Sequence, residues 1–259
     1  MRVAILLVLH DGRDMLASFL ESIQAQTHKD WQLIVIDEAT TDGSSALVRQ
    51  YVPHAVVLRN ARDRGWAHGL NQAMRLALSH KNVDALLWTD TRMAFQPNCL
   101  ERLVASFGDA RVGVVGPVVF QMFEENRLEE ALHERVESDY VYSAGMEGGC
   151  GGPYVLRGYG QRGHAGDDVR ETLAVVRYAL LVKRSALECA RLHDELFVDT
   201  VLESEGVDVD LCLRVQNAGS RVCLVSDAHA YLACGVFKGV PRHVSPPQQL
   251  RLRCSSSQH

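Results

Sequence analysis

Acidic residues recur at the ends of predicted strands in the first part of the chain. Asp11, Asp37, Asp63 and Asp90 lie at or just beyond the ends of four successive apolar runs. If these runs are parallel strands, their carboxyl ends meet at one crevice, which is where open α/β sheets bind ligands. A carboxylate there could accept a hydrogen bond from a base or a ribose hydroxyl, and another could hold Mg²⁺ or Mn²⁺ against a diphosphate. Each acid alone could equally be a helix cap or a solvated loop residue, so the prediction depends on their convergence.

A second acidic pair, Asp208 and Asp210, lies at the start of a predicted helix. Residues two apart do not share a helix face, so these carboxylates should have separate roles. The helix dipole favours an anion in the first turn, which suits a general base that can reach a substrate hydroxyl. Capping of the helix alone is the alternative interpretation.

Alternating elements must position these acids. Strands are predicted at residues 3–9, 31–36, 54–58, 84–90 and 112–116, separated by helices that begin near Asp11, Ser44, Gly65 and Pro97. This alternation indicates βαβ units that form a mostly parallel sheet flanked by helices. After Phe120 the pattern becomes irregular: residues 121–138 are charge-rich, and five glycines occur between Gly145 and Gly152. A strand is expected again at 172–182, a helix at 209–218 and a strand at 221–225.

Composition excludes several classes of protein. The net charge of −5 argues against a nucleic-acid-binding protein, and no apolar stretch is long enough to span a membrane. The seven cysteines form no Cys-x-x-Cys pair, so they predict neither a zinc site nor a disulfide framework, and a reducing compartment is expected. Gly158 to Gly163 fits G-x-G-x-x-G, but it lies in the irregular region rather than between a strand and a helix, which argues against a dehydrogenase.

Several segments, taken in order, resemble family-2 glycosyltransferases with the GT-A (Rossmann-like) fold. The segments that carry the likeness are Val3–Leu9, Leu20 to Thr27, Ile36 to Ser44, Asp63 to Asn71, Trp88 to Asp90 and Val207 to Arg214. Phe197 to Asp199, together with Val207 and Asp208, is similar to rhamnosyltransferase-like members. The likeness predicts one GT-A domain over residues 1–235, with a nucleotide-binding half (1–118), an acceptor-side half (119–235) that contains the irregular insertion, and a partly disordered tail (236–259).

The resemblance implies an inverting transfer of a sugar from a nucleotide-diphosphate donor to a glycan or lipid-linked acceptor. Asp208 would be the general base, and Asp90 would hold a divalent metal, Mn²⁺ or Mg²⁺, on the diphosphate. The implied nucleotide-binding residues are Leu9, Asp11, Asp37, Asp63, Gly65 and Thr89. The enzyme is expected in the cytoplasm, with membrane contact at most peripheral, at the inner face, and homo-oligomerisation is left open.

The chain departs from the family pattern at positions that bear on the metal. Trp88 replaces the first acid of D-x-D, so the metal should bind weakly, and Leu232 stands where a histidine often binds it. Glu38-Ala39 replaces the usual Asp-Gly, and Val207 replaces a Glu. A degenerate, non-catalytic nucleotide-sugar-binding relative or scaffold is therefore the alternative. A sugar-phosphate nucleotidyltransferase is disfavoured, because His10 to Arg13 does not form the glycine-rich loop with Arg and Lys that such enzymes carry.

Overall fold

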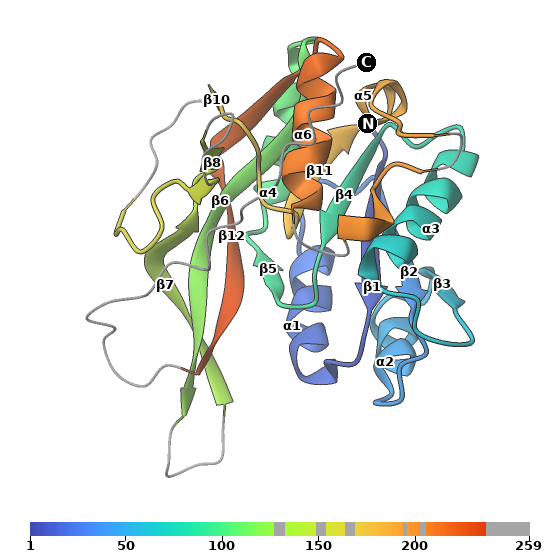
Figure 1. Ribbon diagram of the computed structural model, residues 1–259. Helices are drawn as coiled ribbons and strands as arrows, with labels where there is room; N and C mark the ends of the chain where they lie inside the picture. Colours follow the sequence, from blue (N-terminus) through green and yellow to red (C-terminus); the bar gives the residue numbers. More distant parts are fainter. Residues whose placement is uncertain (127–132, 149–153, 164–168, 194–195, 203–205, 237–259) are drawn as a thin grey trace.

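The structure, a computed structural model, describes residues 1–126, 133–148, 154–163, 169–193, 196–202 and 206–236 (Figure 1). The predicted C-terminal tail lies outside the described residues, apart from Val236. The helices are α1 (Arg13–Gln24), α2 (Ser44–Tyr51), α3 (Trp66–Ser79), α4 (Cys99–Ala105), α5 (Arg184–Cys189) and α6 (Val207–Asn217), with short 3-10 helices at Ser106–Gly108 and Thr200–Leu202. The first strands are β1 (Val3–Leu9), β2 (Trp31–Asp37), β3 (Val56–Arg59), β4 (Ala85–Thr89), β5 (Met93–Phe95) and β6 (Val112–Asn126). The later strands are β7 (His133–Ser143), β8 (Met146–Glu147), β9 (Val155–Leu156), β10 (Val169–Glu171), β11 (Ala179–Lys183) and β12 (Arg221–Val236).

The central sheet has the order β10-β12-β6-β11-β4-β1-β2-β3. Strands β1, β2, β3 and β4 are mutually parallel, and β6 is parallel to β12. Strand β11 lies between β4 and β6 and is antiparallel to both. Its first residue, Ala179, pairs with Thr89, the last residue of β4. The start of β11 therefore meets the carboxyl end of β4, where the predicted crevice lies.

The sheet is buried because its central strands are apolar on both faces, as expected of strands covered by helices on either side. All seven residues of β1 and all five of β4 are buried. Helix α1 contributes the stripe Leu16, Phe19, Leu20 and Ile23 at a helical spacing. The prediction of an α/β fold with a mostly parallel sheet flanked by helices is confirmed (Figure 1). In the described part of the chain no helix is both long and apolar enough to cross a membrane.

The charge-rich segment after Phe120 differs from the prediction of irregular structure. Strand β6 continues to Asn126 and pairs with the antiparallel strand β7, so that the two form a ribbon beside the main sheet (Figure 1). One side of such a ribbon is solvated, so its sequence lacks the continuous apolar run of a buried strand. Strand β12 is likewise longer than the predicted 221–225, and the predicted strand at 172–182 is regular only from Ala179.

Candidate active site

Asp90 follows β4 directly and is held by one arginine. Arg92 donates from its backbone N–H (3.0 Å) and its Nε (2.8 Å) to Asp90 Oδ1, and from Nη2 (3.1 Å) to Oδ2. Burial alone would raise the pKa of Asp90, but the hydrogen bonds and charge of Arg92, with a contribution from the charge of Arg177, outweigh it and lower the pKa. Asp90 is therefore an anion at neutral pH, neutralised by Arg92.

Arg177 and Tyr178, the two residues just before β11, lie near Asp90, because β11 runs antiparallel to β4. Tyr178 lies between two guanidinium groups: Arg92 Cζ is 5.0 Å and Arg177 Cζ is 4.5 Å from its ring centroid. Arg177 Cζ is also 4.8 Å from the ring centroid of Trp66, the first residue of α3. The sequence reasoning named none of these as site residues. A single arginine or tyrosine has no distinctive spacing, and the direction of β11 could not be read from its apolar run.

Asp208 lies in the first turn of α6 and is only 5% exposed. Its Oδ2 accepts a hydrogen bond from the backbone N–H of Arg177 (3.0 Å), and its Oδ1 accepts one from the N–H of Val209 (2.9 Å). Burial raises the pKa of Asp208 above its ordinary value, although both N–H groups and the charge of Arg177 act in the opposite direction. A buried carboxylate with a raised pKa has the properties expected of a general base.

Asp210 has different surroundings from Asp208. Its Oδ2 accepts hydrogen bonds from Arg214 Nε (3.0 Å) and Nη2 (2.7 Å), and Arg214 Nη2 also donates to the carbonyl of Phe197 (2.7 Å). The pair thus ties α6 to the preceding loop. Asn71 of α3 fixes that same loop: its Oδ1 accepts from the N–H groups of Phe197 (2.9 Å) and Val198 (3.1 Å). These contacts hold residues 197 and 198 against α3 and α6.

The predicted nucleotide-binding residues gather at the carboxyl ends of β1, β2 and β4. Leu9 pairs with Asp37 and is 1% exposed, and its carbonyl accepts the N–H of Glu38 (2.9 Å). Asp37 is fully buried, and its carboxylate accepts hydrogen bonds from Ser45, from the N–H of Thr40 (2.8 Å) and from Arg59 Nη1 (2.6 Å). A nucleotide contact at Asp37 therefore requires one of these donors to be exchanged.

The remaining predicted residues are more accessible or lack a partner. Asp11 is exposed and accepts from the N–H of Thr41 (2.9 Å). Asp63 Oδ1 accepts from the N–H of Gly65 (2.8 Å), and its Oδ2 is 3.3 Å from His10 Nδ1. Within the described ranges the buried hydroxyl of Thr89 has no hydrogen-bond partner. The nucleotide-binding roles of all six residues stay predictions.

Asp42, which lies two residues before α2, connects the loops that follow β1 and β2. Its Oδ2 accepts from the N–H groups of Gly12 (2.7 Å) and Arg13 (2.9 Å), so it caps α1 from another loop. Burial would raise the pKa of Asp42, but hydrogen bonds from Ser44, Arg13 and Gly12 lower it to about 2.

Comparison with known proteins identifies the family. Residues 4–163 match the sequence profile of Glycosyl transferase family 2. The chain belongs to glycosyl transferase family 2. A relative is EpsE of Bacillus subtilis (strain 168), provisionally named a glycosyltransferase, which is 30% identical over 129 residues, covering 47% of this chain and 45% of EpsE. The chain thus spans about half the length of this relative.

Solved structures share the GT-A fold at low sequence identity. GalNAc-T7 with UDP, GalNAc and Mn²⁺ has a TM-score of 0.66 at 14% identity, over 91% of this chain and 44% of that protein. The mannosyltransferase PcManGT from Pyrobaculum calidifontis, in complex with GDP-Man and Mn²⁺, has a TM-score of 0.60 at 18% identity, over 90% of this chain and 56% of that protein. S. aureus TarS 1–349 in complex with UDP has a TM-score of 0.58 at 13% identity, over 90% of this chain and 60% of that protein.

A divalent metal of the kind seen in two of these structures would have few ligands from this family-2 chain. The described residues contain no group of three His, Cys, Asp or Glu side chains that could hold a metal ion. Asp90 is a single carboxylate, and Arg92 binds both of its oxygens. One carboxylate with substrate phosphates is nevertheless a usual Mg²⁺ environment. Of the predicted site residues, Asp90 is the one that would hold such a metal, together with the phosphates of a donor.

Two basic residues lie at the other end of β11, away from Asp90. Lys183 and Arg184 end β11 and begin α5, at the opposite end of the strand from Arg177, where Lys183 pairs with Ala85. Arg184 donates to the carbonyls of Leu78 (2.8 Å) and His80 (2.9 Å), so it has a structural role. Leu232, in contrast, pairs with Met93, next to Arg92.

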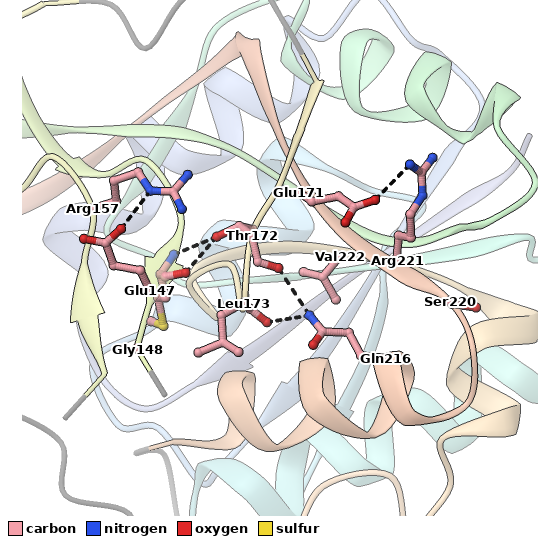
Figure 2. Close-up of a pocket in the computed structure, with 11 residues that line it drawn as sticks. Glu147, Gly148, Arg157, Glu171, Thr172, Leu173, Gln216, Ser220, Arg221 and Val222 are labelled. Carbon is pink, nitrogen blue, oxygen red and sulfur yellow. Dashed lines mark hydrogen bonds and ion pairs between the residues drawn. The ribbon is translucent and has the colours of Figure 1, made fainter. Parts of the chain in front are cut away.

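A pocket of about 480 Å³ lies apart from these residues, between β8, β10 and the C-terminal part of α6 (Figure 2). None of its lining residues is a predicted site residue. Several of its polar side chains already have partners: Arg157 lies 3.4 Å from Glu147, Arg221 lies 2.9 Å from Glu171, and Gln216 donates to the carbonyl of Leu173 at 2.9 Å (Figure 2). The buried Nε of Arg221 has no hydrogen-bond partner among the described residues. We assign this pocket no role in donor binding.

Proposed function

We propose that the protein is an inverting glycosyltransferase that moves a sugar from a nucleotide-diphosphate donor to a hydroxyl of a glycan or lipid-linked acceptor. The observation that carries this proposal is the buried carboxylate of Asp208, held by the N–H of Arg177 close to the end of β4. Membership of glycosyl transferase family 2 supports the reaction type. The nucleotide complexes of its structural neighbours support the donor class.

In the proposed reaction Asp208 takes the proton of the acceptor hydroxyl while the hydroxyl oxygen attacks the anomeric carbon. The bond from that carbon to the diphosphate oxygen breaks, and its electron pair leaves with the nucleoside diphosphate. Attack from the face opposite the diphosphate inverts the configuration. The raised pKa of Asp208 makes it a stronger base than an exposed aspartate, and the N–H groups of Arg177 and Val209 fix its orientation.

Asp90 is the residue that would hold a divalent metal. The metal, when bound, would stabilise the negative charge of the departing diphosphate. Because Arg92 neutralises Asp90, metal and diphosphate should bind together, with weak metal binding to the protein alone. The hydroxyl of Thr89, buried beside Asp90, is a further candidate for a donor contact.

The location of the protein is also a proposal. The described cysteines, Cys99, Cys189, Cys212, Cys223 and Cys234, are all free, which supports a reducing compartment such as the cytoplasm. Peripheral contact with the inner face of the membrane would be compatible with a lipid-linked acceptor.

One observation favours a second candidate function. With both Asp90 oxygens bound to Arg92, a non-catalytic relative could keep the nucleotide crevice without metal-dependent turnover. Such a relative would bind a nucleoside diphosphate equally well with and without Mn²⁺. It would catalyse neither sugar transfer from a bound nucleotide sugar nor slow hydrolysis of that nucleotide sugar.

The test is calorimetric binding of UDP, dTDP and GDP, each with and without Mn²⁺, to the wild type and to Asp90→Ala. We expect one nucleotide to bind more tightly with Mn²⁺ and the metal effect to be lost in Asp90→Ala. Asp30→Ala is the matched control, because Asp30 is exposed and precedes β2, at the amino ends of the parallel strands rather than at their carboxyl ends. Failure of all three nucleotides to bind would refute the proposed donor class, whereas metal-independent binding without turnover would favour the non-catalytic relative.

A further inference from the structure

Arg177 is a fixed cation with no carboxylate partner in the described part of the chain. Its guanidinium lies against the rings of Trp66 and Tyr178, at 4.8 and 4.5 Å from their centroids. The one hydrogen bond of this group among the described residues goes from Nη2 to the Tyr178 hydroxyl (3.2 Å). A guanidinium has five N–H donors, so most of them are available to a ligand.

Two other arginines at the carboxyl ends of the parallel strands are paired with carboxylates. Arg92 binds both oxygens of Asp90, and Arg59 donates to buried Asp37 at 2.6 Å. Arg177, in contrast, has no carboxylate partner among the described residues and is held by aromatic rings beside Asp90. Its charge acts to lower the pKa of both Asp90 and Asp208, although burial leaves the pKa of Asp208 raised, so its position influences both carboxylates.

The position of Arg177 follows from the register of the sheet. Ala179 pairs with Thr89, so the residues just before β11 lie beside Asp90 at the carboxyl end of β4. Tyr178 contacts the guanidinium groups of both Arg92 and Arg177, which keeps the two cations on one ring. A planar, partly buried guanidinium with unused donors suits a phosphate group, which it can bind through two parallel hydrogen bonds.

We propose that Arg177 binds the diphosphate of the donor and stabilises the charge that develops on it as the bond to the sugar breaks. This inference rests on the proposed function and adds a cation from the protein itself to that function. Arg177 donates hydrogen bonds and transfers no proton, because the acceptor proton goes to Asp208. The diphosphate should consequently bind in part without any metal.

The backbone and the side chain of Arg177 make different contacts, so they can be tested separately. The bond to Asp208 comes from the backbone N–H, so replacing the side chain leaves this bond in place. Arg177→Gln removes the charge and most donors but keeps a polar side chain, although a shorter one. Arg191→Gln is the matched control, because Arg191 also lies over an aromatic ring, 5.2 Å from the centroid of Phe197, but follows α5 at the far end of β11.

The experiment measures binding by calorimetry in EDTA for three ligands: the nucleoside diphosphate that the wild type prefers, its nucleoside, and inorganic pyrophosphate. We expect Arg177→Gln to bind the nucleoside diphosphate and pyrophosphate about ten- to a hundredfold more weakly, the effect of losing a charge-assisted hydrogen bond, with the nucleoside unaffected. Arg177→Lys, which keeps the charge but loses the planar fork, should bind with intermediate affinity. Arg191→Gln should bind all three ligands like the wild type.

Two outcomes separate this inference from the proposed function. If the wild type and Arg177→Gln bind the nucleoside diphosphate equally, the inference is wrong and the proposed function stands. If the wild type binds no nucleoside diphosphate, with or without Mn²⁺, and no pyrophosphate, both are wrong. Should Arg177→Gln fail to fold, Arg177→Lys decides. Its ratio of diphosphate to nucleoside affinity must fall below that of the wild type, and an unchanged ratio overturns the inference.

Discussion

Replacement of Asp208 by Asn is the sharpest test of the proposed reaction. The amide has nearly the same shape as the carboxylate, and its oxygen can still accept the N–H of Arg177. It cannot accept a proton at neutral pH. Loss of a positioned general base typically costs 10²- to 10⁴-fold in rate, or about 2.7 to 5.4 kcal/mol in the activation barrier.

The same variant should change the pH dependence of both rate and stability. Because burial raises the pKa of Asp208, the wild-type rate should fall on acidification through a pH above the ordinary aspartate value of about 3.9. In this range the folded wild type binds more protons than the unfolded chain, so its stability falls as pH rises from the unfolded pKa through the folded pKa. Asp208→Asn lacks this group and should lose both effects.

The assay combines single-turnover sugar transfer with urea unfolding, each at several pH values between 4 and 8. Asp210→Asn is the control: it weakens the ion pair with Arg214 and should lower stability, but it should leave the acid limb of the rate profile in place. A rate for Asp208→Asn within tenfold of the wild type, with the acid limb unchanged, would refute the assignment of Asp208 as the base.

Three further variants test how the loops are held. Asn71→Leu leaves two buried N–H groups and one carbonyl of residues 197–198 without partners. The free energy of unfolding, measured in urea, should therefore fall by at least about 3 kcal/mol. A decrease below about 1 kcal/mol would contradict this expectation. Ala39 has a φ of 57°, in the left-handed region. Ala39→Gly should therefore stabilise the protein by about 0.5 to 1 kcal/mol and raise its melting temperature. A lower melting temperature would argue against backbone strain at Ala39. Asp42→Ala removes the cap of α1 and should cost about 1 kcal/mol at neutral pH. Because the pKa of Asp42 is lowered to about 2, its contribution should disappear as pH falls from about 4 to 2, as acid titration of both proteins by circular dichroism would show.

The part of the site that could be predicted from sequence lies at the ends of apolar runs. Asp90 was found because a buried strand has to end in polar residues, and the direction of a strand within a βαβ series is fixed. Arg177 was not found, because β11 lies outside that series and an apolar run does not reveal whether its strand is parallel or antiparallel. Asp42 caps α1 across about 30 residues of sequence, a contact that local capping rules do not predict.

The fold of the second half was predicted less well for a related reason. The sequence reasoning used continuous apolar runs to find strands, and these occur where both faces of a sheet are covered. In strand β7, exposed Glu137 and Asp139 alternate with half-buried Ser138 and Tyr140, which is the pattern of a half-solvated strand. Because of these charged residues, the strand could not be predicted from a continuous apolar run.

The place of β11 in the sheet also affects how the chain can fold during synthesis. Strand β4 ends at Thr89, and its neighbour β11 ends at Lys183, so the ribosome must add 94 more residues (183 − 89) before the centre of the sheet can close. At typical elongation rates this takes roughly 5 to 20 s. During that time the apolar strand β4 has an unpaired edge. Nascent chains of this protein should therefore depend on chaperones more than those of a protein in which neighbouring strands follow one another in sequence.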